Sequence, residues 1–449
     1  MKVKFLTLPP LFLLVLMACL QTPVATATVP TPPPPAELLW CHLVATSDIA
    51  LSKDGQYVAA VGPAELSSDL VFYSRSSGTP IWTYTVADFF WSVAISADGD
   101  CVAAGNGSRV FFWKNARSRT PVNTVPTWTS VDLGGPISER CLAISNDGNY
   151  LVAGGTGPTV YYWANAKGRM GSSEATTWQK GGFGDVAAVD MSSDGNYVVA
   201  GVGTKVAYWK DATTQRHVID STQDWLSLNL GDLIVDVAVS DDGNYVAAAA
   251  VVDTVYYWAG ARDRTSTNEP ITWDGGLGVG FTSIDMSSDG GRVIAGASVG
   301  GFPPTGMVYF WDGARGRSDE PSPPSWTYTT AGEVHDVAIN DAGDYMAAAN
   351  DAITPNVYFF DSSGDLKWTY EIFEEAHLLS ISSDGGTLAI GTGLITSRYL
   401  VSTGYRTPTR AVGGVLLPAD KLALISPWIA LALAAVAITV FATKRRRKP

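Results

Sequence analysis

One phrase recurs along most of this 449-residue chain, and its repetition constrains the fold more than any other feature. Its clearest copy begins at Asp236 with Asp-Val-Ala-Val-Ser-Asp-Asp-Gly-Asn-Tyr, continues with Val and four alanines, and ends with Val-Tyr-Tyr-Trp at Trp258. The alternating Val residues predict a strand, and Asp-Gly predicts a tight hairpin in which both central residues adopt positive φ. Two β-rich runs and a later Trp273 predict three further strands. A repeated unit of four short antiparallel strands is typical of a β-propeller blade.

Side-chain size within the unit supports the same fold. The second strand is rich in Ala and Gly, as at 103–105, 153–155 and 247–250, whereas the third strand is aromatic, as at 111–113, 161–163 and 309–311. Blades diverge outward from a common axis, so small residues suit the narrow part and large rings fill the wedge. We therefore expect these aromatic residues to form core and not a cofactor site.

The repeat count predicts the number of blades. Asp-Gly turns begin at Asp54, Asp98, Asp147, Asp194, Asp242, Asp289 and Asp384, and Ala342-Gly343 is a variant. The fourth-strand tryptophans are Trp40, Trp82, Trp128, Trp178, Trp225, Trp273, Trp326 and Trp368. Because the first Trp precedes the first turn, we predict an all-β, eight-bladed β-propeller over residues 37–402 in which one blade combines strands from both ends (3+1 closure). Seven blades is the alternative, if one irregular unit is not a full blade.

Both ends of the chain carry membrane-related signals. Lys2 and Lys4 precede an apolar run, which predicts a signal peptide over 1–27, followed by a proline-rich spacer over 28–36. Two routes of signal-peptide processing are open. One is cleavage after the Ala25-Thr-Ala motif, and the alternative is lipidation of Cys19, because Leu-Met-Ala-Cys resembles a lipobox.

Near the C-terminus, a linker over 403–421 leads to an uncharged segment over 422–442, which is long enough to span a bilayer as one transmembrane helix. The basic tail at 443–449 predicts a cytoplasmic end and an extracellular propeller, so we expect a single-pass protein of the cell membrane.

The net charge restricts the partners. The chain has a formal charge of −13 although both termini are basic, and no basic face with interleaved aromatic residues is evident. Such a surface repels nucleic acid, so we expect no nucleic-acid partner.

The loops divide between two faces. Basic pairs follow the third strand in several units, as at Asn115-Ala-Arg-Ser-Arg and Gly313-Ala-Arg-Gly-Arg, on the face that carries the Asp-Gly turns. We expect them to pair with those carboxylates, and an anion-binding ring is the alternative. The opposite face carries irregular, Gly-rich loops with aromatic residues, where propellers usually place binding. The candidate binding residues there are Phe89, Phe90, Trp91, Phe183, Phe281 and Phe302.

Other candidate sites are sparse. Cys101 and Cys141 are the most plausible disulfide pair in an oxidising exterior. Asn106-Gly-Ser is a glycosylation sequon. The histidines form no metal-ligand pattern and no Gly-x-Ser-x-Gly elbow occurs, so we expect no metal site, no cofactor and no catalytic residue.

The repeats resemble two propeller families. Val-Ala-Ile-Ser-x-Asp-Gly-x-Tyr-Val-Ala-Ala-Gly followed by Val-Tyr-Tyr-Trp is similar to the WD40 repeats over nearly all of 37–402, although only Trp311-Asp312 supplies the Trp-Asp pair. The stretches 71–84 and 357–370 resemble repeats of the quinoprotein (PQQ) propellers, without the adjacent Cys pair that often lies beside that cofactor. The segment 412–428 is similar to C-terminal anchors of secreted archaeal and some bacterial proteins.

Two functions remain open. The favoured one is a non-catalytic cell-surface scaffold that binds a protein or glycan of the cell envelope, with the membrane itself contacted through the C-terminal helix. The alternative is an extracytoplasmic quinoprotein-like oxidoreductase or a propeller hydrolase. Charged side chains that converge on the central channel would favour the enzyme. The first strands, which line such a channel, are mostly Val, Ala, Ile and Ser and favour the scaffold.

Overall fold

The computed structural model describes residues 36–403, apart from short gaps at 43–45, 65–66, 216–217, 220–222, 265–269, 277, 302–304, 319–321, 353–354, 373–374 and 393–397. All of them belong to the compact unit Met1–Tyr405, and Arg406–Pro449 forms a second unit. The predicted signal peptide with Cys19, the transmembrane helix at 422–442 and the tail at 443–449 lie outside the described residues. Among the described residues, no helix has the length and apolar character needed to cross a membrane.

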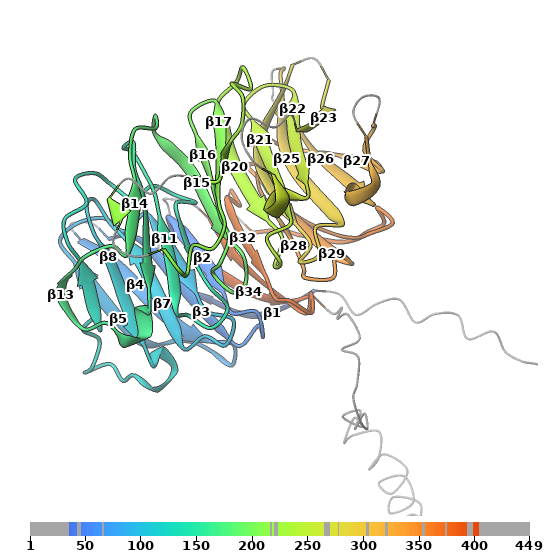
Figure 1. The fold of residues 1–449 in the computed structure, drawn as a ribbon. Helices are drawn as coiled ribbons and strands as arrows, with labels where there is room; N and C mark the ends of the chain where they lie inside the picture. The colour runs from blue at the N-terminus through green and yellow to red at the C-terminus, as the bar shows by residue number, and fades with distance from the viewer. Residues whose placement is uncertain are drawn as a thin grey trace, which may run out of the picture. The chain divides into compact units, whose positions relative to one another are not determined.

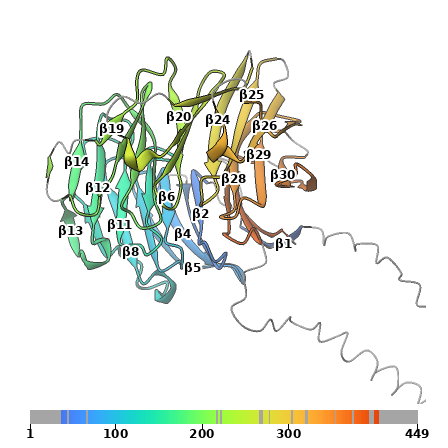
Figure 2. The same ribbon diagram turned by 45° about the vertical axis from the view of Figure 1, so that its right-hand side comes forward.

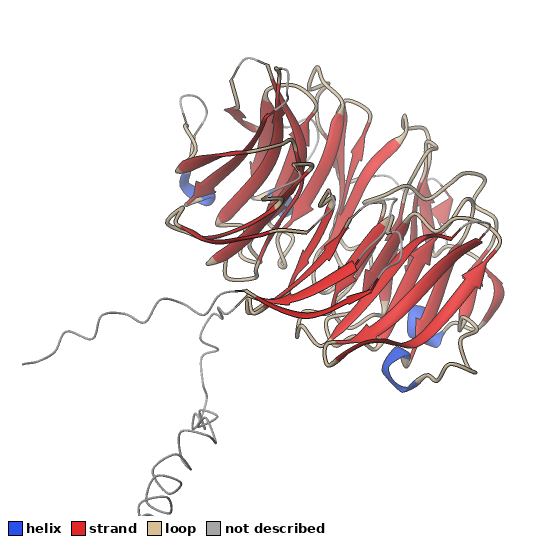
Figure 3. Cartoon of the chain, turned by 180° about the vertical axis from the view of Figure 1, so that it is seen from behind, coloured by secondary structure: helices blue, strands red, loops and turns tan. Residues whose placement is uncertain are grey.

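The described residues are nearly all strand and loop (Figure 3), and they form eight sheets, each with four antiparallel strands. In seven of the sheets these four strands follow one another in chain order. We number the sheets 1 to 8 along the chain and call the first strand of each sheet its inner strand. Sheet 1 contains β2 (Asp48–Leu51), β3 (Tyr57–Ala64), β4 (Ser67–Ser74) and β5 (Ser77–Val86). Sheet 2 contains β6 (Ser92–Ile95), β7 (Cys101–Gly105), β8 (Val110–Lys114) and β9 (Trp128–Ser130), and β13 (Gly171–Glu174) adds to it in parallel. Sheet 3 contains β10 (Leu142–Ile144), β11 (Tyr150–Ala153), β12 (Val160–Ala164) and β14 (Trp178–Lys180), with β18 (Val218–Ile219) added in parallel.

The later sheets repeat this plan. Sheet 4 contains β15 (Val186–Met191), β16 (Val198–Val202), β17 (Lys205–Trp209) and β19 (Trp225–Leu226). Sheet 5 contains β20 (Ile234–Val239), β21 (Tyr245–Ala250), β22 (Thr254–Ala259) and β23 (Ile271–Asp274). Sheet 6 contains β24 (Val279–Met286), β25 (Arg292–Val299), β26 (Thr305–Asp312) and β27 (Trp326–Thr330). Sheet 7 contains β28 (Val334–Ile339), β29 (Tyr345–Asn350), β30 (Val357–Asp361) and β31 (Leu366–Tyr370).

Sheet 8 combines strands from both ends of the described chain. It contains β32 (Leu378–Ile381), β33 (Thr387–Gly391), β34 (Arg398–Ser402) and, as its last strand, β1 (Glu37–His42). β1 runs antiparallel to β34 and pairs Glu37 with Ser402. Figures 1 and 2 show the blue β1 beside the orange-red strands of the C-terminal part.

The aromatic residues pack between neighbouring sheets, as predicted. Tyr162 of sheet 3 stacks on Trp178 at 4.9 Å between ring centroids, and Trp178 stacks on Trp209 of sheet 4 at 5.5 Å. The Trp178 indole N–H donates across the same boundary to the carbonyl oxygen of Ala212 at 3.1 Å. Small residues in the second strands, such as Ala247 and Ala249, are fully buried. The wedge of large rings outside small residues therefore forms the core between sheets.

The Asp-Gly turns differ from the prediction in one respect. Gly55 has φ of 68°, but Asp54 is not among the positive-φ residues, so only the glycine adopts the left-handed conformation. Instead, the Asp54 carboxylate accepts from the Ser52 hydroxyl at 2.6 Å and from the Gln56 N–H at 3.0 Å. Aspartate here stabilises the turn through its side chain, which is why a Ser two residues before it recurs with it.

We call the end of the propeller with these turns the turn face. It also carries four single-turn 3-10 helices that follow third strands: η1 (Ala116–Ser118), η2 (Ala166–Gly168), η3 (Ala261–Asp263) and η4 (Ala314–Gly316). We call the opposite end, which connects second to third strands and fourth strands to the next inner strand, the loop face.

Candidate functional site

The inner strands surround a central cavity of about 430 Å³ to which every sheet contributes residues. Its middle is apolar, because the residue just before each turn points toward it. This apolar set consists of Leu51, Ile95, Ile144, Met191, Val239, Met286, Ile339 and Ile381. The predicted apolar channel lining is therefore present at this level.

Five aspartates of the inner strands also reach the cavity region: Asp48, Asp190, Asp236, Asp285 and Asp336. Each uses its two oxygens in the same way. In Asp190, for example, Oδ1 accepts from the N–H of the next residue, Met191, at 2.8 Å, and Oδ2 accepts from the N–H of Val239 in the next sheet at 2.8 Å. These carboxylates therefore join neighbouring inner strands.

Arg140 crosses the channel on the loop-face side of this cavity. Arg140 stands two residues before β10 of sheet 3, and its backbone has a positive φ of 58°. Its guanidinium donates to the carbonyl oxygens of Thr282 in sheet 6 and His335 in sheet 7. Its guanidinium lies 3.7 Å from an oxygen of Asp236 and 3.4 Å from an oxygen of Asp336. One side chain thus contacts the inner strands of three sheets on the far side of the channel.

Lys53 makes a similar crossing at the turn face. Its Nζ lies 3.3 Å from Asp241 and 3.4 Å from Asp341, which belong to the turns of sheets 5 and 7. Arg140 and Lys53, which we call the two channel latches, therefore contact the opposite wall at both ends of the cavity.

Burial in the channel changes the acidity of its carboxylates. It raises the pKa of Asp48 and of Asp190 to about 7 and that of Asp285 to about 8. Burial also raises the pKa of Asp236 and Asp336, although Arg140 opposes the change. For Arg140 itself, burial disfavours the charge, but Asp236 and Asp336 raise its pKa above the usual value.

The charged side chains of the channel were not predicted. The sequence analysis expected mostly Val, Ala, Ile and Ser there, and the structure adds two cations and several carboxylates. The repeat contains a signal that could have identified the two cations. Arg140 stands five residues before the turn serine Ser145, and Lys53 directly follows the turn serine Ser52. Both positions differ by an even number from that of the apolar channel residues, which stand directly before the turn serine, so the period-2 alternation of a strand turns all of them toward the channel.

The loop-face aromatic candidates separate into core and surface. Phe90 and Phe281 are core residues, 0% and 2% exposed, and pack edge-on against Phe111 and Tyr309, so their prediction as binding residues is wrong. The sequence analysis placed both in loops, but Phe281 belongs to β24, and the side chain of Phe90 folds back from its loop into the core.

The other aromatic candidates remain closer to the surface. Phe183 is partly buried against Trp209, and Phe89 is 41% exposed beside Trp91, with ring centroids 6.1 Å apart. Phe302 lies outside the described residues.

Asn106, the first residue of the predicted glycosylation sequon, is buried. It is 5% exposed, and its side-chain oxygen accepts from the N–H groups of Ser108 at 3.2 Å and Arg109 at 2.8 Å. The amide therefore shapes the turn, and its burial disfavours glycosylation.

The predicted disulfide does not form, because Cys101 and Cys141 are both free thiols. Cys101 begins β7 at the turn face, whereas Cys141 stands just before β10 near the loop face. Burial raises the pKa of each thiol to about 12, so both behave as inert core residues.

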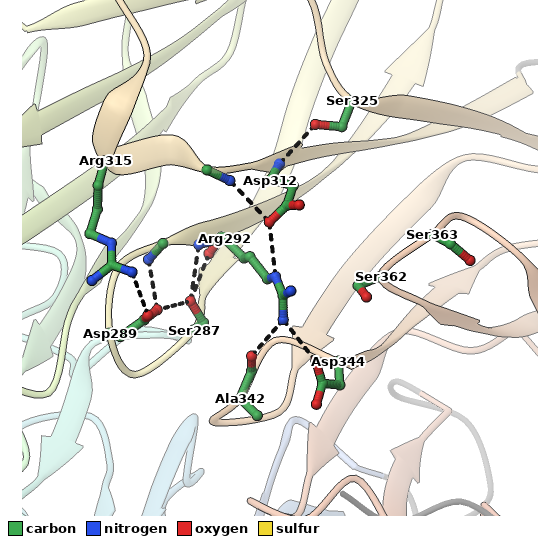
Figure 4. A network of polar contacts seen from close by, with 12 residues as sticks. Ser287, Asp289, Arg292, Asp312, Arg315, Ser325, Ala342, Asp344, Ser362 and Ser363 are labelled. Atoms are coloured by element: carbon green, nitrogen blue, oxygen red, sulfur yellow. Dashed lines mark hydrogen bonds and ion pairs between the residues drawn. The ribbon is translucent and has the colours of Figure 1, made fainter.

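The basic pairs on the turn face are used within the fold. The first Arg of a pair contacts the turn carboxylate, as Arg315 does with Asp289 at 2.8 Å. The second Arg binds its own loop, as Arg317 does through the carbonyl oxygens of Asp312 and Pro323 and the hydroxyl of Ser325. Figure 4 shows this region together with Arg292, which joins Asp312 of sheet 6 to Asp344 of sheet 7. These contacts agree with the predicted structural role.

The described residues offer no group of three or more His, Cys, Asp or Glu arranged to hold a metal ion. His335 and His377 stack at 4.2 Å between ring centroids on the loop-face side, and His377 contacts Glu375 at 3.1 Å. Burial and the neighbouring His377 lower the pKa of His335.

Comparison with known proteins finds similarity to WD40 propellers. Residues 134–164 match the family described as WD domain, G-beta repeat (WD40). The fold matches the C-terminal WD40 domain of Sif2 with a TM-score of 0.60 and 14% sequence identity, covering 82% of this chain and 98% of that domain. No curated protein sequence matches the chain. The resemblance to WD40 propellers is thereby confirmed, as a fold and at one repeat.

Proposed function

We propose that this WD40-like β-propeller is a non-catalytic scaffold that binds another protein or a glycan through its loop face. WD40 propellers are commonly protein-interaction scaffolds, and the observation that carries the proposal for this chain is the use of the channel carboxylates. Each of them accepts N–H groups from two inner strands, as Asp285 does from Met286 and from Ile339, and the two latches contact the far wall. The charged side chains of the channel therefore hold the sheets together, and we expect the loops of the loop face to bind the partner.

The same proposal includes a closed ring of eight blades with 3+1 strand closure. Its support lies at the boundary between sheets 8 and 1. There the N–H of Leu51 donates to the Ser380 hydroxyl at 3.0 Å, and the N–H of Ser383 donates to the carbonyl oxygen of Lys53 at 2.8 Å. The ring of Trp40 packs at a tilt of 32° against that of Tyr73 of sheet 1, with 4.8 Å between ring centroids. The seven-bladed alternative needs an incomplete unit, and each of the eight sheets described has four antiparallel strands.

We also propose a cell-surface location, with the segment at 422–442 as a single transmembrane helix and the tail inside. The pairing of Glu37 with Ser402 puts both ends of the described propeller on the turn face, where third strands end and fourth strands begin. A chain anchored beyond residue 403 is thus tethered at the turn face, and the loop face stays free for an envelope protein or glycan.

Site-specific photo-crosslinking tests the scaffold function and its face. A photoreactive residue is introduced in the full chain at Phe89 or Val252 on the loop face, or at Val122 on the turn face; all three side chains are exposed. In native membranes, we expect the two loop-face positions to capture the same partner and Val122 not to capture it. Equal capture from both faces, or none from either, contradicts the proposal.

An enzyme is the second candidate, and two observations favour it. Charged side chains converge on the channel, as Arg140, Asp236 and Asp336 do, which the sequence analysis named as favouring an enzyme. Asp190 and Asp285 have pKa values of about 7 and 8, which suits a general acid or base at neutral pH. Purified full chain would be assayed with chromogenic ester, phosphate and glycoside substrates and for bound quinone. Turnover by wild type that is lost in both D190N and D285N, with folding intact, would establish the enzyme. We expect no turnover, because Asp190 and Asp285 already bind backbone N–H groups.

A further inference from the structure

The loop face carries one continuous patch formed by three connections around sheet 5. These are the loop at 227–233 before β20, the turn at 251–253 between β21 and β22, and the described residues Gly275, Gly276 and Gly278 after β23. Backbone hydrogen bonds join them: the N–H of Val251 donates to the carbonyl oxygen of Leu233 at 2.9 Å, and that of Gly275 donates to Asp253 at 2.6 Å. The three connections therefore form a single surface.

Apolar side chains are unusually exposed on this patch. Leu233 is 58% exposed, Val251 42% and Val252 44%, and Leu228 in the same first loop is 43% exposed. Other large exposed apolar residues of the described chain are scattered, and several of them, such as Val122 and Met170, follow third strands on the turn face. A cluster of exposed aliphatic groups marks an interaction site more often than isolated ones do.

The charge of the patch has one sign. Asp232 and Asp253 lie in the first two connections, and residues 227–234, 250–254 and 274–279 contain no Lys or Arg. On the turn face, by contrast, carboxylates such as Asp98 and Asp289 face Arg117 and Arg315. The patch thus offers negative charge around an aliphatic centre.

We propose that this patch binds a cationic, amphipathic segment of a partner protein, with Lys or Arg residues on both sides of an apolar side chain. Charge complementarity selects this occupant. The negative charge repels anionic lipid and nucleic acid. The exposed apolar side chains Leu233, Val251 and Val252 are aliphatic, so they offer a glycan no aromatic ring for stacking. The inference rests on the proposed scaffold function and specifies its partner.

Binding of short fluorescent peptides to the full chain in non-ionic detergent tests the inference. The probe alternates Lys or Arg with Leu, and two matched peptides replace either every Leu by Ser or every cation by Glu. We expect only the probe to bind, with an affinity that falls as salt rises. The Ser peptide measures attraction to the overall charge of −13, so equal binding of that peptide overturns the inference.

Surface variants localise the binding. The patch variants are L233S/V251S/V252S and D232N/D253N, and the control is V122S/V125S, which changes two exposed residues on the turn face. We expect each patch variant to bind the probe about tenfold more weakly and the control to be unchanged, with the same thermal midpoint in all three. A loss that is equal in the control, or absent from the patch variants, contradicts the inference.

Calcium titration and the crosslinking result separate the remaining outcomes. If Ca²⁺ binds wild type but not D232N/D253N and blocks the probe, the carboxylates form a cation site and the inference fails. If loop-face crosslinking captures a partner while no peptide binds, the scaffold function stands and the cationic partner is wrong. If crosslinking finds no partner, the scaffold function itself falls.

Discussion

The turn face repeats the same contacts from sheet to sheet, whereas the loop face changes at each sheet. On the turn face, Ser and Asp side chains stabilise the turns of seven sheets, and Asn340 replaces the serine in sheet 7. Basic residues pair with the turn carboxylates, as Arg315 does with Asp289. On the loop face, connections differ in length and composition and expose groups such as Val251 and Val252. Repetition on one face and variation on the other indicate that the first maintains the fold and the second is free to recognise a partner.

Truncation of a wedge tryptophan gives the largest expected difference between core and loop face. Trp178 is 1% exposed and lies between Tyr162 and Trp209, so Trp178→Ala should lower the free energy of unfolding by about 3–5 kcal/mol. Val252→Ser on the exposed loop face should change it by no more than about 0.5 kcal/mol. Chemical denaturation followed by Trp fluorescence measures both, and comparable losses would mean that the loop face is also part of the stabilising core.

Removal of the Arg140 latch should have the next largest effect. Arg140→Met leaves Asp236 and Asp336 facing each other without a cation, so we expect a loss of about 2–3 kcal/mol. The triple variant R140M/D236N/D336N should recover part of the loss, because it removes the uncompensated charge. The same denaturation experiment checks both variants, and no recovery would assign the effect to the carbonyl contacts of Arg140 instead.

The pH dependence of stability should distinguish the channel from the turn face. Folded Asp190 and Asp285 keep their protons up to about pH 7 and 8, whereas unfolded aspartates release them near 3.8, so the free energy of unfolding falls as pH rises through this interval. On the turn face, contacts to the ionised form lower the pKa of Asp98 and Asp289, whose contribution is lost only below about pH 4.

Thermal unfolding at pH 5 and pH 8 measures this channel contribution. At about 1.4 kcal/mol per pKa unit, the pKa of Asp190 corresponds to a loss of about 3 kcal/mol over the interval and that of Asp285 to a loss of about 4 kcal/mol. We therefore expect wild type to lose several kcal/mol, and D190N/D285N, which keeps Asp48, to lose less. The lowered pKa of His335 acts in the opposite direction in both proteins and cancels in the comparison. Identical slopes for the two proteins would show that the channel carboxylates are ionised at pH 5.

The two arginines of one basic pair should show the smallest difference. Arg317 binds two carbonyl oxygens and a hydroxyl, so Arg317→Gln should cost roughly 1–2 kcal/mol. Arg315 makes an exposed ion pair, and Arg315→Gln should cost roughly 0–1 kcal/mol, with less difference in high salt. A greater loss for Arg315 would mean that ion pairs, and not loop anchoring, stabilise the turn face.

Sequence alone determined the features that repeat. Four strands per unit, the Ser-x-Asp-Gly turns, the small second strand and the aromatic wedge all follow from local patterns, because each is set by neighbours within one unit or the next. The pairing of basic loops with acidic turns was predictable for the same reason.

Only the tertiary structure decided which residues meet across the channel and which loop residues are buried. Arg140 reaches Thr282, which is 142 residues away in sequence, and Lys53 reaches Asp241, 188 residues away. Burial of Phe90 and Asn106 likewise depends on how each loop folds back on its own and neighbouring sheets, and that of Phe281 depends on β24 extending beyond the predicted loop boundary. A repeat pattern specifies each sheet and its neighbours, but contacts across the channel depend on the curvature that all the sheets create together.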